Sequence, residues 1–214
     1  KLKGDYQLAI DEAMLCHELA ILEDNKNMIL KSWNRLGILS RRTEQYEEAI
    51  KYFIGIINHV DRYDLSPIHK ARAYHNLGNV YWDNKDFESA ESYYLKSIEI
   101  YKERNKKLNL FWNYRDLSAL YFETKQFDKS AQLGNLALSV YDKIPLDLEN
   151  YQLFRNLSEL NFEIGNYELA RQFTDKYHAE NDKFIAKRND IVEKNNKFKI
   201  EVVLAGYYEQ IKAR

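Results

Sequence analysis

Cysteine, proline and glycine are all scarce in this sequence, and each shortage narrows the range of possible folds. The single cysteine, Cys16, excludes an internal disulfide and a cysteine-based metal cluster. Only two prolines and seven glycines occur among 214 residues, which argues against an all-β protein with its many tight turns. These shortages favour a helical chain.

Neither the net charge nor the hydropathy of the chain indicates that it binds nucleic acid or spans a membrane. The 32 basic and 33 acidic residues leave a formal net charge of −1, so the chain has no global electrostatic footprint for nucleic acid. The longest apolar run, at 52–57, is far shorter than the roughly 20 residues that span a bilayer. We therefore expect no direct contact with nucleic acid and no membrane span within this segment.

The sequence also lacks any grouping of residues that would support catalysis. Its five histidines show no spacing typical of a metal-binding helix, and its glycines lie too far apart for a phosphate-binding loop. Acidic pairs such as Glu47 and Glu48 lie on the outer faces of predicted helices, where charged side chains are ordinarily solvated. We predict a protein that is not an enzyme and that needs neither a metal nor a cofactor.

What the sequence does contain is an internal repeat. An aromatic residue returns at steps of 40 or 41 residues, and a small residue follows it three positions later in each copy. The aromatic positions are Tyr6, Tyr46, Phe87, Phe127 and Tyr167. A nearly fixed period of this length indicates a repeat architecture, in which each unit buries its apolar face by stacking on its neighbours.

The repeat at 66–105 shows how one unit is expected to fold. Ser66 followed by Pro67 predicts the start of a helix, with the serine hydroxyl accepting a free backbone N–H. Apolar residues then recur at helical spacing until a polar segment interrupts them, and Asp86 can cap a second helix. Each unit is therefore predicted to be a pair of antiparallel helices joined by a short turn.

The repeats resemble the tetratricopeptide-repeat family at its signature positions. The best copy has Tyr74, Leu77, Gly78, Tyr81, Ala90 and Tyr94, and another has Trp33, Leu36, Gly37, Ala49 and Phe53. Small residues at these positions would let the paired helices approach closely. Two later copies are degraded, because serine replaces the glycine and Gly134 and Thr174 replace a large residue. The resemblance implies an all-α fold, a right-handed solenoid of antiparallel helix hairpins, with a period longer than the usual repeat of about 34 residues.

We divide the chain into a repeat array at 1–180 and a C-terminal segment at 181–214. The array holds about four and a half repeats, at 1–25, 26–65, 66–105, 106–145 and 146–180, and the first has only its second helix. The C-terminal segment is expected to form one long amphipathic helix, with Phe184, Ile191 and Phe198 spaced by seven. This helix either caps the array or acts as a linker, as in the sensor regions of bacterial signalling proteins that it resembles. Self-association through it is a further alternative.

One set of polar and aromatic residues is expected on the concave surface, which the first helices of successive repeats line. The set comprises Asn34, Arg41, His75, Asn79, Trp82, Trp112, Arg115, Phe122 and Arg155. Because arginine and tryptophan often carry interface energy, we predict that this concave groove binds an extended peptide with an acidic group. The alternative for the aromatic residues is packing between adjacent first helices.

These observations predict a non-catalytic scaffold that binds a protein or peptide. The first interpretation is the sensory or interaction segment of a larger bacterial signalling protein. A second follows from a resemblance to Gram-positive quorum-sensing proteins and is a peptide-responsive regulator of transcription or of a phosphatase. A third is an adaptor that assembles a complex through its convex face. The sequence leaves the compartment open: cytoplasmic by default, and periplasmic if the segment precedes a transmembrane span.

Overall fold

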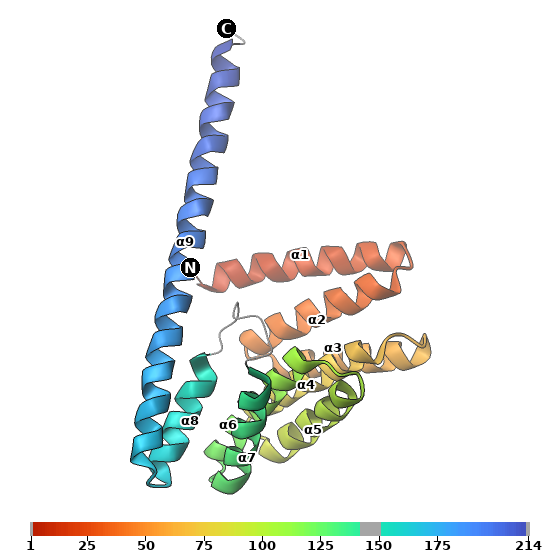
Figure 1. The fold of residues 1–214 in the computed structure, drawn as a ribbon. Coiled ribbons are helices and arrows are strands. Elements are labelled where there is room, and N and C mark those ends of the chain that lie inside the picture. The colour runs from red at the N-terminus through yellow and green to blue at the C-terminus, as the bar shows by residue number, and fades with distance from the viewer. Residues whose placement is uncertain (1, 142–150, 213–214) are drawn as a thin grey trace. The chain divides into compact units, whose positions relative to one another are not determined.

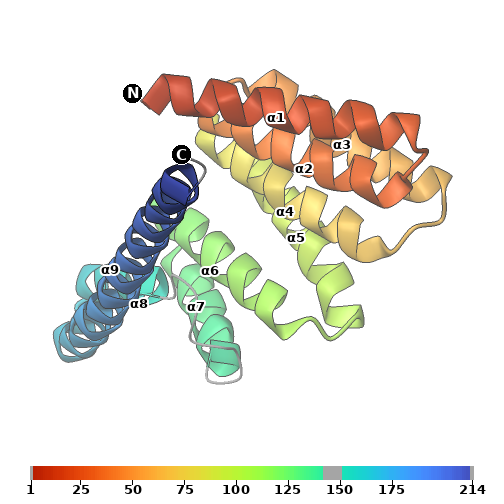
Figure 2. The same cartoon turned by 90° about the horizontal axis from the view of Figure 1, so that it is seen from above.

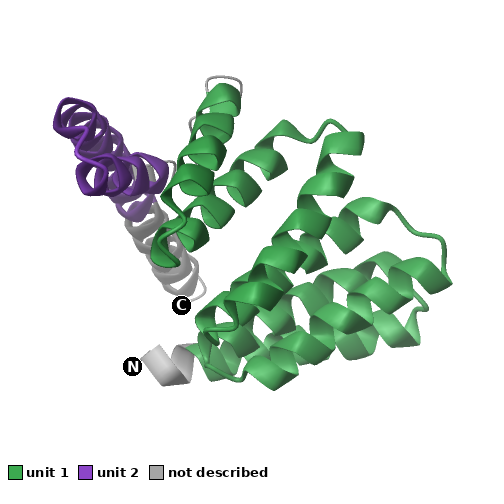
Figure 3. Cartoon of the chain, turned by 90° about the horizontal axis from the view of Figure 1, so that it is seen from below, with its two compact units in different colours: residues 1–144 green, residues 145–214 purple. Residues whose placement is uncertain are grey.

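The computed structural model describes residues 2–141 and 151–212, and all secondary structure in these two ranges is α-helical. The helices are α1 Leu2–Leu22, α2 Lys26–Arg42, α3 Tyr46–Arg62, α4 Pro67–Asp83, α5 Phe87–Glu103, α6 Lys107–Glu123, α7 Phe127–Tyr141, α8 Tyr151–Glu163 and α9 Tyr167–Lys212. The chain divides into two compact units, residues 1–144 and 145–214 (Figure 3). The predicted all-α fold is confirmed for the described residues, whereas the predicted repeat boundary at 145/146 lies outside them.

The first unit consists of helix pairs stacked in chain order (Figures 1 and 2). α2 pairs with α3, α4 with α5 and α6 with α7, while α3 packs on α4 and α5 on α6. α1, which was predicted as the second helix of the first repeat, packs on α2. The helices α2 to α6 each have 17 residues, and turns of three or four residues between them produce the period of 40 or 41.

The tight turns between helices contain residues in the left-handed backbone conformation. Positive φ angles occur at Asp24, Glu44, Asp64, Lys85, Asn105, Lys125 and Gly165. At the end of α2, for example, the Glu44 N–H donates to the Arg41 carbonyl and the Gln45 N–H donates to the Ser40 carbonyl. Such bonds use the free carbonyls of a helix end. The scarcity of glycine therefore did not prevent tight turns, because residues with side chains accept this strained conformation.

We expect Glu44→Gly to stabilise the protein by about 1 kcal/mol, because glycine adopts the φ of 61° without steric strain. For a chain of this size, such a change corresponds to a rise in Tm of roughly 2–4 °C. Thermal unfolding followed by circular dichroism measures it, with Glu44→Ala, which keeps the strain, as the control. A Glu44→Gly protein that melts below the wild type would show that the glutamate side chain contributes more than its strain costs.

The predicted start of α4 is correct, but the predicted capping bond is wrong. Pro67 begins the helix, yet the Ser66 side chain makes no capping hydrogen bond. With φ −54° and ψ 125° at Ser66, its backbone carbonyl accepts the His69 N–H at 3.1 Å instead. At α5 the prediction is confirmed, since Asp86 Oδ1 accepts the Ser89 N–H at 3.1 Å.

A glycine of the first helix lies against an aromatic ring of the second helix in two repeats. A Cβ atom on Gly37 would lie 2.7 Å from the Phe53 ring, and one on Gly78 would lie 2.7 Å from the Tyr94 ring. Phe53 and Tyr94 are both fully buried. The ring therefore occupies the volume that any side chain on the glycine would need.

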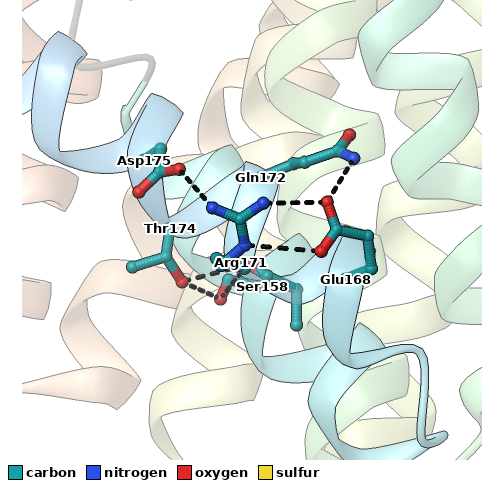
Figure 4. Close-up of polar contacts among 7 residues, drawn as sticks. Ser158, Glu168, Arg171, Gln172, Thr174 and Asp175 are labelled. Atoms are coloured by element: carbon teal, nitrogen blue, oxygen red, sulfur yellow. Dashed lines mark hydrogen bonds and ion pairs between the residues drawn. The ribbon is translucent and has the colours of Figure 1, made fainter.

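The two degraded repeats replace this ring contact with hydroxyl hydrogen bonds. In one of them, Gly134 stands at the position of the aromatic residue, and Ser118 stands at the position of the glycine. The Ser118 hydroxyl donates to the Ser130 carbonyl at 2.8 Å. In the second unit the Ser158 and Thr174 hydroxyls are 2.6 Å apart (Figure 4). The degraded repeats thus lack both the glycine and the aromatic residue, and hydroxyl hydrogen bonds connect their paired helices instead.

The second unit is the antiparallel pair of α8 and α9. α9 runs for 46 residues without a break, so the second helix of the last repeat and the predicted C-terminal helix are one element that crosses residue 180. Phe173 is buried against α8, where its ring stacks on Phe154, whereas Ile191 is 49% exposed. The side chain of Phe198, the last member of the predicted seven-residue pattern, lies outside the described part of the chain.

A neutral histidine joins α1 to α2. His17 Nε2 accepts the Trp33 indole N–H at 3.1 Å, and His17 Nδ1 lies 2.9 Å from the Ser32 hydroxyl. Because Nε2 is an acceptor, the ring proton is on Nδ1 and is donated to Ser32, whose hydroxyl donates in turn to the Ile29 carbonyl at 2.9 Å. Burial lowers the pKa of His17, and burial also lowers the pKa of His59, whose ring meets the Trp33 ring edge to face.

We therefore expect stability to fall as the pH drops below the ordinary histidine pKa of 6.5. Both folded-state pKa values are lowered, so below that pH the unfolded chain binds more protons than the folded chain. The stability contribution is complete above the ordinary value and is lost as the pH falls through the folded pKa values. Urea unfolding at a series of pH values measures the slope, which should be shallower in His17→Gln. An unchanged slope in that variant would assign the effect to other groups.

Candidate functional site

Eight of the nine predicted ligand-binding residues lie on α2, α4 and α6, the first helices of three successive repeats. They form the surface that we call the first-helix face: Asn34 and Arg41 on α2, His75, Asn79 and Trp82 on α4, and Trp112, Arg115 and Phe122 on α6. The ninth, Arg155, lies on α8 in the second unit and pairs with Glu159 at 2.9 Å. The first-helix face therefore belongs to one unit.

Polar side chains connect α2 to α4 across this face. Asn76 Nδ2 donates to Asn34 Oδ1 at 2.9 Å, and Arg41 Nε lies 3.6 Å from a carboxylate oxygen of Asp83. The partners are 42 residues apart in both pairs, about one repeat. Asn34 and Arg41 are thus in the register that the repeat period predicted, and each has a partner on the neighbouring helix.

A second set of polar contacts connects α4 to α6. His75 Nε2 donates to Asp116 Oδ2 at 2.8 Å, and the Trp82 indole N–H donates to Glu123 Oε2 at 2.5 Å. Lys85 Nζ lies 3.0 Å from the other oxygen of Glu123. The polar edges of His75 and Trp82 therefore hold adjacent first helices together, as the packing alternative proposed for Trp82.

Asp116, which sequence reasoning missed, lies at the centre of this arrangement and is only 7% exposed. Its carboxylate accepts hydrogen bonds from His75 and from Arg115 Nε, the latter at 2.7 Å. Burial opposes its ionisation, but the Arg115 charge and the His75 hydrogen bond outweigh burial, and the pKa of Asp116 is lowered. The Arg115 guanidinium also lies 4.5 Å from the centre of the Trp112 ring. Arg115 is thus held by an ion pair and a ring.

Asn79 is oriented by a buried tyrosine of α5. The Tyr94 hydroxyl donates to Asn79 Oδ1 at 2.6 Å. Burial raises the pKa of Tyr94 well above its ordinary value, so the phenol remains protonated and remains a donor. Asn79 Nδ2 has no acceptor among the residues that the structure describes, so an oriented N–H donor remains unused on this face.

Three half-buried aromatic rings provide the apolar part of the first-helix face. They are Trp82, Trp112 and Phe122. Phe122 packs on Phe127 of α7 with ring centres 5.8 Å apart, and Trp112 packs on Phe111 at 4.9 Å. Each of the three side chains keeps part of its surface exposed. The face therefore combines apolar area with an oriented amide donor.

The described part of the chain contains neither a candidate metal site nor a candidate membrane-spanning helix. Within residues 2–141 and 151–212, His, Cys, Asp and Glu side chains form no group of three or more that could hold a metal ion. None of the helices in these ranges is both long and apolar enough to cross a membrane.

The chain matches a known family in two regions. Residues 69–143 and 30–57 match the family Tetratricopeptide repeat. A search of curated proteins gave no match. The two family matches agree with the helix pairs, their register and the glycine–aromatic contacts described above, and this chain contains tetratricopeptide repeats.

Solved structures share the fold at low sequence identity. BtubC (BKLC) from P. vanneervenii has a TM-score of 0.71 at 18% identity, over 84% of this chain and 74% of that one. The apo form of RapI has a TM-score of 0.70 at 18% identity, over 85% of this chain and 50% of that one. A Rap protein complexed with Competence and Sporulation Factor has a TM-score of 0.61 at 13% identity, over 85% of this chain and 60% of that one. This chain thus spans about half the length of RapI.

Proposed function

We propose that this chain is a non-catalytic scaffold that binds an extended peptide segment on its first-helix face. The observation that carries the proposal is the combination, on one face, of three half-buried aromatic rings with the oriented Asn79 donor. Rigid aromatic side chains supply contact area at low entropic cost, and an amide donor matches a peptide carbonyl. Since α2, α4 and α6 are already connected by side-chain bonds, little ordering is required of the protein on binding.

The proposed setting is a larger bacterial signalling protein in which this segment senses or recruits a partner. A peptide-responsive regulator is the second candidate, and the observation that favours it is the fold shared with a Rap protein complexed with Competence and Sporulation Factor. Whichever flanking domains are present, the ligand is expected to contact the same face.

Self-association through α9 remains a separate prediction. Among the described side chains of this helix, Ile185, Ile191 and Val192 are 46%, 49% and 50% exposed. An isolated helical segment gains little stability in water without a packed apolar face, so a second α9 is one partner that would cover these side chains.

Trp82→Ala is expected to weaken ligand binding by about 1–3 kcal/mol, because a central aromatic anchor is removed. The test is selection of peptides from a displayed random library on the wild-type chain, followed by calorimetric titration of the selected peptides. Asn79→Ala should weaken binding as well, since the oriented donor is lost. Glu88→Ala, on the exposed part of α5, is the matched control and should bind like the wild type. Selected peptides that bind both first-helix variants at wild-type affinity would place the site elsewhere.

A further inference from the structure

We propose that Asp116 sets the ligand specificity of the first-helix face, making its centre select a neutral apolar residue over an acidic one. The proposal rests on the proposed function and names the ligand class: a peptide segment that is uncharged where it meets Trp82, Trp112 and Phe122. It replaces the acidic group that the sequence alone suggested.

The charges of the face are already paired with one another. The pairs are Arg115–Asp116 at 2.5 Å, His75–Asp116 at 2.8 Å, Arg41–Asp83 at 3.6 Å and Lys85–Glu123 at 3.0 Å. Apart from the histidine, three cations thus meet three carboxylates. A ligand carboxylate approaching the centre of the face encounters a dipolar pair and no net positive charge, so its electrostatic attraction is weak.

An acidic ligand could bind Arg115 directly only by displacing Asp116. Asp116 is 7% exposed, and its side chain is enclosed between His75 and Arg115. Separating Arg115 from it would leave a buried carboxylate with one partner, which is strongly unfavourable. The ligand carboxylate would also lose its hydration, so the exchange gives no net gain.

What the centre still offers suits an uncharged peptide. Asn79 Nδ2 is directed by the Tyr94 hydroxyl bond to its Oδ1, so it can donate to a backbone carbonyl. The half-buried rings of Trp82, Trp112 and Phe122 can cover an aliphatic or aromatic side chain. Lys31 and Arg72 lie one helical turn before Asn34 and His75, towards the N-terminal ends of α2 and α4. The inference therefore concerns the ligand residues at the centre of the face and not the residues at the ends of the ligand.

The experiment uses random decapeptides displayed and selected on the wild-type chain, on Asp116→Asn, and on Asp128→Asn as a control for removing one carboxylate. Asp128 is exposed on α7 and is not one of the paired charges of the face. The central positions of each selected peptide are then varied to leucine, glutamine and glutamate. Wild type and Asp128→Asn are expected to prefer leucine. Asp116→Asn frees Arg115 and should raise the affinity for the glutamate peptide about tenfold or more relative to wild type.

The outcomes separate this inference from the proposed function. Glutamate preferred at the centre by the wild type would overturn the inference while leaving the face as the site. An Asp116→Asn protein that folds and binds the glutamate peptide no more tightly than the wild type would overturn it as well. Should Asp116→Asn fail to fold, the wild-type preference alone decides. Peptides that bind equally well to Trp82→Ala and Asn79→Ala would overturn both the inference and the proposed function.

Discussion

Gly78→Leu is expected to destabilise the first unit by about 3 kcal/mol or more, because the added side chain overpacks a closed helix pair. Even a Cβ atom at this position would lie 2.7 Å from the Tyr94 ring. Tyr94 has little freedom to move aside, since it is fully buried, donates its hydroxyl to Asn79 and lies against the His75 ring at 5.6 Å. Helix propensity, which favours leucine over glycine by roughly 1 kcal/mol, is too small to offset the clash.

A second glycine in the middle of a helix provides a matched control. A Cβ on Gly55 of α3 would lie 3.5 Å from the Trp33 ring, which is ordinary van der Waals contact. Gly55→Ala should therefore stabilise the protein by about 0.5–1 kcal/mol, whereas Gly78→Ala should destabilise it. Urea unfolding of both variants gives the comparison. If Gly55→Ala and Gly78→Ala changed the free energy of unfolding equally, Tyr94 would have to shift at little cost, and its ring would not be the reason for the glycine at position 78.

The sequence pattern located the small residues of each repeat but not their true partners. Gly78 and Ala90 were interpreted as small residues that let the paired helices approach closely. The structure shows that Gly78 makes room for the ring of Tyr94, which lies sixteen positions later. The same offset relates Ser118 to Gly134, which explains why the glycine and the ring disappear together. The period reveals equivalent positions, whereas the partner of each position depends on how two helices cross.

The turns show a different limit of sequence interpretation. Glycine and proline are the residues from which turns are ordinarily predicted, and this chain has few of either. Lys85 and Lys125 nevertheless adopt φ angles of 64° and 59°. Their conformation is held by hydrogen bonds from turn amides to the carbonyls of the preceding helix. Residue type alone does not reveal this local compensation.

For the candidate site, the repeat register placed all nine residues on first helices, namely α2, α4, α6 and α8, but it could not show how the side chains are paired. Asp116 follows Arg115 directly and lies 41 positions after His75, so the repeat offset contained the signal. It was missed because only positions expected on the concave surface were considered, whereas Asp116 is buried beside them. Glu91 of α5 similarly accepts the hydroxyl of Tyr121, which lies on α6 in the next repeat, at 2.5 Å. Side-chain pairing between repeats requires the rotation of each helix, which the period does not supply.

Arg115→Ala is expected to lower the free energy of unfolding by about 2–4 kcal/mol, because it removes one partner of a buried ion pair. Asp116 would keep only the His75 hydrogen bond at 2.8 Å. Arg41→Ala is the matched control: its partner Asp83 is 47% exposed, so its loss should cost about 1 kcal/mol or less. The double variant Arg115→Ala/Asp116→Asn should recover part of the loss, since no buried charge is then left unpaired.

The pH dependence of these variants distinguishes a buried charge from lost packing. In the wild type the lowered pKa of Asp116 contributes stability that is complete above the ordinary pKa of 3.8 and is lost as the pH falls through the folded pKa. Without the Arg115 charge, less remains to counteract the effect of burial, which raises the folded-state pKa of Asp116. The carboxylate then takes up a proton at a higher pH than in the wild type. The difference in stability between wild type and Arg115→Ala should therefore be largest near neutral pH and should shrink on acidification. Urea unfolding of both proteins from neutral pH down to about pH 4 measures this trend. A difference that stays constant with pH would mean that Arg115 contributes through its contact with Trp112, and that the charge of Asp116 is adequately stabilised without it.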